Sequence, residues 1–286
     1  MGRRLAALWA VGNSVTRDYI REGTWRMAAA IAFYSLFAAG PLLLFVLDAG
    51  RHLMRMDDVR EALFGRLAFV VGRHGADSIN ELLSEYSFPK PGLTGYGLGL
   101  LTLVFGGVNA VGQLRESINR VWPEQIRERD TRSARGDYVV DLAFVVGFGL
   151  LLVTSLVVSA LLRYAGTQLE GNIPMAYSIF RLVDSLVFVA IFLTAILLLF
   201  RYLPAPNLSW PSLFAGALVA SVLFTIARGL LVFWLARGNV GSAFGSVSSM
   251  IVFLVWVYVS AQILLFGAAF TGRVEARRLE ADQAAA

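Results

Sequence analysis

The sequence has no cysteine, only two histidines and a single lysine, Lys90. Without cysteine, disulfides, thiol nucleophiles and thiolate metal sites are excluded. A phosphate-binding loop of the GxxxxGK[ST] type is excluded as well, because no lysine stands in that pattern. The histidines, His52 and His74, lack the i, i+4 spacing of a helical metal pair. We therefore expect no metal ion, no other cofactor and no enzyme activity.

Charge is also scarce, since 16% of the 286 residues are charged and 57% are hydrophobic. The uncharged residues form long blocks, and about 20 apolar residues in a helix cross the roughly 30 Å hydrocarbon layer of a bilayer. The pattern predicts an all-α, polytopic membrane protein with a bundle of about six transmembrane helices. The expected spans are residues 27–48, 92–114, 139–162, 182–203, 210–236 and 246–270, in a single membrane domain, 1–272, followed by a C-terminal tail, 273–286.

Two other segments mix apolar and charged residues at helical spacing. Residues 5–22 predict an amphipathic helix that lies along the membrane. Residues 51–90, the first outer loop, predict two short amphipathic helices. This loop either caps the bundle and rests on the membrane, or docks a partner protein of the cell envelope.

Basic residues are distributed unevenly between the two sides of the expected bundle. With the N-terminus in the cytoplasm, 15 of the 25 basic residues fall on the cytoplasmic side and nine on the opposite side. Short cytoplasmic segments are enriched in arginine and lysine, so we expect both termini in the cytoplasm. Basic flanks are what topology alone requires, and no nucleic-acid partner is expected. The arginines of residues 115–137 either belong to a solvated helical hairpin or turn, or attract anionic lipid headgroups.

Polar residues inside the spans are candidate substrate-binding groups, because hydrocarbon penalises them unless they pair or face a cavity. Arg228 interrupts the fifth span near its outer end, and Asp184 opens the fourth span at similar depth. Three interpretations stay open for Arg228: snorkelling to the interface, an ion pair with Asp184, or contact with a substrate phosphate or carboxylate.

A second candidate set lies nearer the cytoplasmic side. It comprises Asn109 and Gln113 of the second span, Asp141 at the start of the third and Gln262 of the sixth. These side chains are expected to form interhelical hydrogen bonds, or else to line a polar cavity. Pro41, inside the first span, predicts a helix kink.

Several patches resemble a known family in content and in order along the chain. They are Ala30 to Leu44, Ser117 to Trp122, Gly241 to Ser246, Phe253 to Gln262 and Gly267 to Phe270. The chain resembles the YihY / virulence factor BrkB family, which implies a multi-pass protein of the bacterial cytoplasmic (inner) membrane. Members were once widely labelled ribonuclease BN. Hydrolysis of RNA would need metal ligands or a general acid and base, which the expected cytoplasmic segments lack, so we do not expect a ribonuclease.

Two function classes follow from these observations. The first is a transport-class protein that moves or presents a lipid or another amphiphile, with membrane lipids as its partners. The alternative is a non-catalytic structural or partner-docking protein of the envelope. Glycine pairs with GxxxG spacing, such as Gly95 and Gly99, allow close helix contacts either within one bundle or in a homo-oligomer.

Overall fold

The computed structural model describes residues 19, 21–53, 93–127, 134–170, 193–204, 208–237 and 248–285, and these residues form helices and no strand. The all-α prediction is confirmed. The helices are α2 (Thr24–Leu53), α4 (Leu93–Val121), α5 (Glu124–Arg127), α6 (Ala134–Glu170), α8 (Trp210–Arg237), α10 (Ser248–Ala285) and a shorter helix, Leu193–Tyr202.

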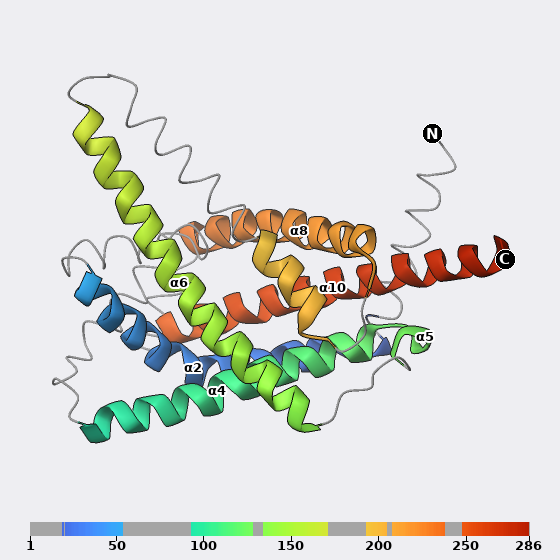
Figure 1. Ribbon diagram of the computed structural model, residues 1–286, viewed down its shortest axis with the longest axis horizontal. Helices are drawn as coiled ribbons and strands as arrows, with labels where there is room; N and C mark the ends of the chain where they lie inside the picture. The colour runs from blue at the N-terminus through green and yellow to red at the C-terminus, as the bar shows by residue number, and fades with distance from the viewer. Residues whose placement is uncertain are drawn as a thin grey trace.

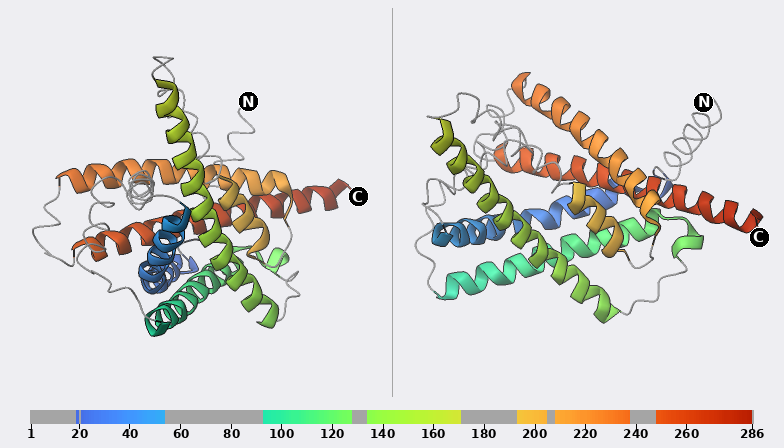
Figure 2. Two further views of the ribbon diagram at one scale, coloured as in Figure 1. Left: turned by 60° about the vertical axis from the view of Figure 1, so that its left-hand side comes forward. Right: turned by 45° about the horizontal axis from the view of Figure 1, so that its top comes forward.

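Helix α10 runs through the middle of the described bundle (Figure 1). It packs against α8 on one side and against α2 and α4 on the other. Helices α2 and α4 lie side by side, and α6 crosses them at a steep angle before its second half leaves the bundle (Figures 1 and 2).

Five helices are long and apolar enough to cross a membrane, which confirms a polytopic membrane protein. They coincide with five of the six expected spans. The expected fourth span, 182–203, lies outside the described residues as far as residue 192, and its end is the helix Leu193–Tyr202. The candidate spans are Thr24–Phe45, Gly97–Val121, Gly136–Thr154, Trp210–Ala227 and Met250–Gln283.

Two helices continue beyond the expected span ends. Helix α4 passes Leu114 and ends at Val121, because Ile118 and Val121 are buried against neighbouring helices. Helix α10 continues through the expected tail to Ala285. That stretch is rich in alanine, arginine and glutamate, which have high helix propensity.

The buried core gathers at one end of the bundle, where α2 begins at Thr24, α8 begins at Trp210 and α4 ends at Val121; we call this the packed end. Away from it, the large apolar side chains of α4, α6 and α8 are mostly exposed, as expected for helices that face lipid. The residues at the centre of the core are Ala28, Ile118, Phe200, Leu203, Leu213, Ala217, Leu265 and Ala268.

Pro41 lies inside α2, which remains a single helix from Thr24 to Leu53. Proline has no N–H to donate to the carbonyl four residues earlier, so the helix loses one hydrogen bond there. The ribbon of α2 changes direction between its two ends, in keeping with the expected kink (Figure 1).

The contact between α8 and α10 depends on glycine. A Cβ on Gly216 would lie 2.6 Å from the carbonyl oxygen of Gly267 and 2.9 Å from Cβ of Thr271. A Cβ on Gly267 would in turn lie 2.8 Å from that of Ala220. The two backbones therefore approach more closely than side chains would allow.

Replacing Gly216 by alanine should lower the free energy of unfolding by about 1–3 kcal/mol, because the new methyl group overpacks this crossing. Gly229 of the same helix is the matched control, since a Cβ there meets nothing within 4 Å. Both substitutions raise helix propensity equally, by about 1 kcal/mol. The measurement is the denaturation midpoint of the purified chain in detergent, and equal midpoints for Gly216→Ala and Gly229→Ala would contradict the close crossing.

Candidate functional site

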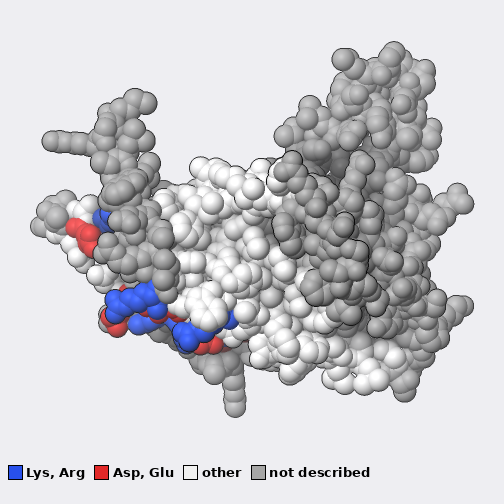
Figure 3. Space-filling model, turned by 180° about the vertical axis from the view of Figure 1, so that it is seen from behind, with Lys and Arg blue, Asp and Glu red and all other residues white. Residues whose placement is uncertain are grey.

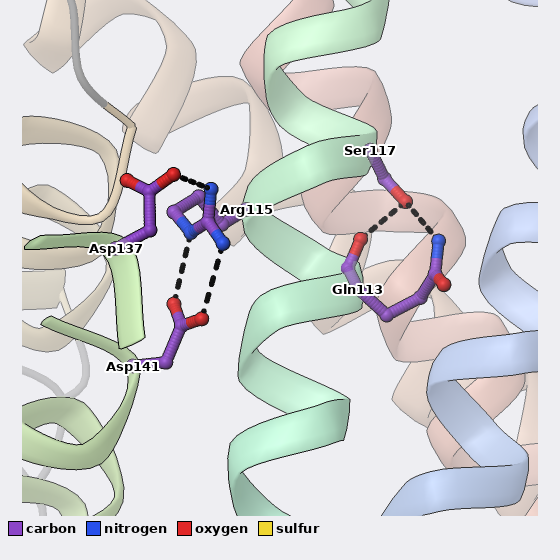
Figure 4. Close-up of polar contacts among 5 residues, drawn as sticks. All are labelled: Gln113, Arg115, Ser117, Asp137 and Asp141. Atoms are coloured by element: carbon purple, nitrogen blue, oxygen red, sulfur yellow. Dashed lines mark hydrogen bonds and ion pairs between the residues drawn. The ribbon is translucent and has the colours of Figure 1, made fainter. Parts of the chain in front are cut away.

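The arginine that follows the second expected span is held by two carboxyl groups. Arg115 of α4 donates from Nε to Oδ1 of Asp141 at 3.0 Å and from Nη2 to Oδ2 at 3.1 Å. Its Nη1 lies 2.9 Å from Oδ2 of Asp137 (Figure 4). The Arg115 side chain is 17% exposed. Bidentate, charge-assisted hydrogen bonds between arginine and carboxylate are strong and directional, so they hold α6 against α4.

The sequence builds this contact from local helix geometry. Asp137 and Asp141 stand four residues apart at the start of α6, hence on one face and near the positive end of the helix dipole. Gly112 of α4 makes room for the second carboxylate, because a Cβ there would lie 2.9 Å from Oδ2 of Asp141. We expected Arg115 in a solvated helical hairpin or turn. The described part of this segment is helical, but Arg115 lies within α4 and in a partly buried ion pair instead of in solvent.

A second polar contact joins the start of α8 to α10. The hydroxyl of Ser209, the residue before α8, donates to the carboxylate of Glu275. The hydroxyl groups of Ser209 and Ser212 lie 3.1 Å apart. Glu275 is buried, and its negative charge sits at the N-terminal end of α8, where the helix dipole stabilises it.

Two aromatic side chains bind backbone carbonyls of α10. The hydroxyl of Tyr19 donates to the carbonyl of Gln262 at 3.1 Å, and Nε1 of Trp122 donates to that of Ala268 at 2.9 Å. Burial, assisted by the nearby Tyr258, raises the pKa of Tyr19 to about 12. The hydroxyl therefore stays protonated and remains a donor at any physiological pH. Tyr19 and Trp122, which are far apart in the sequence, are thus both attached to α10.

The three expected amides bond mainly within their own helices. Asn109 donates to the carbonyl of Phe105 at 2.6 Å, and Nε2 of Gln113 lies 3.4 Å from the hydroxyl of Ser117. Nε2 of Gln262 donates to the hydroxyl of Tyr258 at 2.9 Å. The expected interhelical side-chain hydrogen bond is confirmed for Asp141, which accepts from Arg115 of α4, but is not found for the three amides among the described residues. The carbonyl of Gln262 bridges helices instead, by accepting from Tyr19.

Several buried side-chain oxygens have no hydrogen-bond partner among the described residues. Oε1 of Gln262 is one of them, and it belongs to the predicted set. The others were not singled out from the sequence, although each is a polar residue within or next to an apolar run. They are Asn119 Oδ1, Asp137 Oδ1, Ser221 Oγ and Ser260 Oγ.

The predicted outer pair, Arg228 and Asp184, falls outside the side chains that the structure describes. Arg228 lies within α8, but its side chain is outside the described residues, as is Asp184. The first outer loop, 51–90, and most of the N-terminal segment also lie outside them. An ion pair between Arg228 and Asp184, and a substrate contact by either, stay predictions.

Charged side chains gather at the packed end, while the rest of the described surface in this view carries none (Figure 3). Two of the exposed arginines there are paired with glutamates on their own helices. Nη2 of Arg120 lies 3.0 Å from Glu116, and Nη2 of Arg127 lies 3.6 Å from Glu124. Within the described ranges, no three histidine, aspartate or glutamate side chains gather as metal ligands would.

The sequence matches the family described as Virulence factor BrkB over residues 15–286. It is similar to UPF0761 membrane proteins of several bacteria. That of Ralstonia nicotianae is 26% identical over 246 residues, which cover 85% of this chain and 54% of the relative. That of Rhodospirillum rubrum is 26% identical over 97% of this chain and 62% of the relative, and that of Tolumonas auensis is 25% identical over 86% and 78%.

The chain thus spans between about half and two thirds of the length of the first two relatives. No solved structure matches it. The names of these relatives describe them as membrane proteins and state no activity.

Replacing Arg115 by glutamine should lower the free energy of unfolding by about 3 kcal/mol, because it leaves two carboxylates close together without their cation. Arg120→Gln is the matched control: its side chain is 52% exposed and its pair with Glu116 contributes at most about 0.5 kcal/mol. Thermal unfolding in detergent measures both. A loss for Arg115→Gln no larger than that for Arg120→Gln would show that the ion pair does not hold α6.

Proposed function

Since the chain belongs to the virulence factor BrkB family, we propose that it is a transport-class membrane protein that moves or presents a lipid or another amphiphile. The proposal places it in the bacterial inner membrane with both termini in the cytoplasm. The excess of basic residues in the expected cytoplasmic segments favours this orientation. The packed end then faces the cytoplasm.

The observation that carries the proposal is the set of buried oxygens without partners. Four helices supply them: Asn119 belongs to α4, Asp137 to α6 and Ser221 to α8, while α10 contributes Ser260 and Gln262. A polar atom that stays unpaired in hydrocarbon costs several kcal/mol, and bundles normally avoid this. An interior with spare acceptors and hydroxyl groups suits a polar guest, such as a headgroup, that resides there only for part of a cycle.

The outer faces of the helices suit the apolar part of such a guest. Exposed leucine, valine and phenylalanine side chains follow α4, α6 and α8 away from the packed end. Only 6% of the apolar window of α6 is buried, against 33% for α4 and α10. Acyl chains can therefore reach α6 directly from the bilayer, while the ion pair of Arg115 holds its first turns in place.

The proposal predicts accelerated movement of labelled lipid between leaflets when the chain is reconstituted into vesicles. The assay uses lipids with a fluorescent headgroup label and a membrane-impermeant reductant that bleaches only the outer leaflet. Gln262→Leu should slow this movement about tenfold, because it removes an interior hydrogen-bond acceptor at similar side-chain volume. Gln283→Leu, at the exposed far end of the same helix, is the control and should keep the wild-type rate.

The test covers ethanolamine, glycerol and choline headgroups and one single-chain amphiphile. If vesicles with the chain bleach no further than protein-free vesicles for every probe, transport is ruled out and the docking alternative remains. If Gln262→Leu and Gln283→Leu slow lipid movement equally, the unpartnered interior oxygens are not the basis of transport.

A further inference from the structure

Two helices begin at the packed end with an exposed tryptophan whose indole ring is in cation–π contact with an arginine. The guanidinium of Arg26 lies 5.5 Å from the ring centroid of Trp25, in the first turn of α2. That of Arg201 lies at the same distance from the ring of Trp210, the first residue of α8. Both rings are more than half exposed. In Figure 1 the first turns of α2 and α8 lie at a similar position along the length of α10.

Each tryptophan stands at the end of a stripe of exposed apolar side chains. On α2 the stripe continues from Trp25 to Phe33 and Phe37, which are eight and twelve residues further on. On α8 every fourth residue from Trp210 is exposed and apolar: Phe214, Leu218, Val222 and Ile226. Residues four apart share a helix face, so each stripe runs from the interface into the hydrocarbon with its tryptophan at headgroup level.

The backbone seats Arg26 in this position. Gly23 has a positive φ of 65°, and its amide carbonyl accepts from the backbone N–H of Arg26 at 3.0 Å. The positive φ favours glycine at this position, and a Cβ there would lie 2.7 Å from Nη2 of Arg26, so a larger residue would displace the guanidinium.

Arg26 and Arg201 differ from Arg115, Arg120 and Arg127 in what they face. Neither has a carboxylate within ion-pair distance among the described residues. Nη1 of Arg201 donates to the carbonyl of Leu208 at 2.6 Å. This bond positions the guanidinium, and its other N–H groups can still donate to a phosphate. Arg120 and Arg127, by contrast, are already paired with glutamates.

We propose that these two tryptophan and arginine pairs are binding sites for acidic phospholipids of the surrounding leaflet. At each site the guanidinium binds the lipid phosphate, the indole ring lies at the level of the glycerol backbone, and the acyl chains lie along the apolar stripe. Arginine matches phosphate geometry with two parallel hydrogen bonds. The lipid is held at the rim of the bundle, so the proposal stands whether or not the chain moves lipid through its interior.

The test is a titration of the full chain, purified in a detergent with a neutral headgroup, with dioleoyl phosphatidylglycerol or dioleoyl phosphatidylcholine. Native mass spectrometry counts the lipids bound per chain. The wild-type chain should retain two phosphatidylglycerol molecules more tightly than phosphatidylcholine. Arg26→Gln and Arg201→Gln should each weaken one of them about fivefold, since a cation at the membrane surface contributes about that factor.

Arg120→Gln and Arg127→Gln are the matched controls, because each removes one positive charge from the same end. They should leave phosphatidylglycerol binding within about twofold of wild type. An equal loss in all four variants would mean a diffuse charge effect and would overturn the proposal. So would equal binding of the two lipids.

Inorganic phosphate distinguishes a lipid site from a free-anion site. Phosphate in the millimolar range should not displace the bound lipid, because the stripe contributes to its binding; displacement would overturn the assignment to lipid. Trp25→Leu tests the same site without changing charge, and it should weaken binding less than Arg26→Gln. Leaflet exchange in vesicles should be unchanged in Arg26→Gln, which separates this proposal from the proposed function.

Discussion

The close crossing of α8 and α10 determines where the other polar groups of the packed end can meet. Because Gly216 and Gly267 bring the two backbones together, the start of α8 lies against the last third of α10. Ser209 then reaches Glu275, and Trp122, the residue after α4, reaches the carbonyl of Ala268 on the adjacent stretch of α10. In a bilayer, where apolar contact between helices gives little driving force, such backbone proximity and hydrogen bonding hold the bundle together.

The apolar runs predicted the membrane crossings well, because a span of hydrocarbon demands about 20 uncharged residues whatever the tertiary structure. They predicted the ends of α4 and α10 poorly. A charged residue looks like the end of a span in the sequence, yet Arg115 continues α4 since Asp137 and Asp141 neutralise it from another helix. Partners that are far apart in the sequence leave no local signal.

In the candidate site, too, the sequence predicted where a residue lies but not which partner it bonds. That Gln262 lies in the interior followed from a polar residue within an apolar run. The atom that its amide bonds did not follow, because the bond goes to Tyr258, one turn earlier on the same helix, and a polar residue in an apolar run does not indicate which neighbour it uses. Arginine likewise has two uses at the packed end that composition cannot separate: pairing with carboxylates, as in Arg120, and stacking on an exposed indole, as in Arg26.

Helix α10 is 38 residues long, which corresponds to about 57 Å at 1.5 Å per residue, nearly twice the thickness of the hydrocarbon layer. It is also the helix that α2, α4 and α8 all contact. Unless it is strongly tilted, a helix of this length cannot be contained in the hydrocarbon layer, so the last turns of α10, past the packed end, lie outside the hydrocarbon.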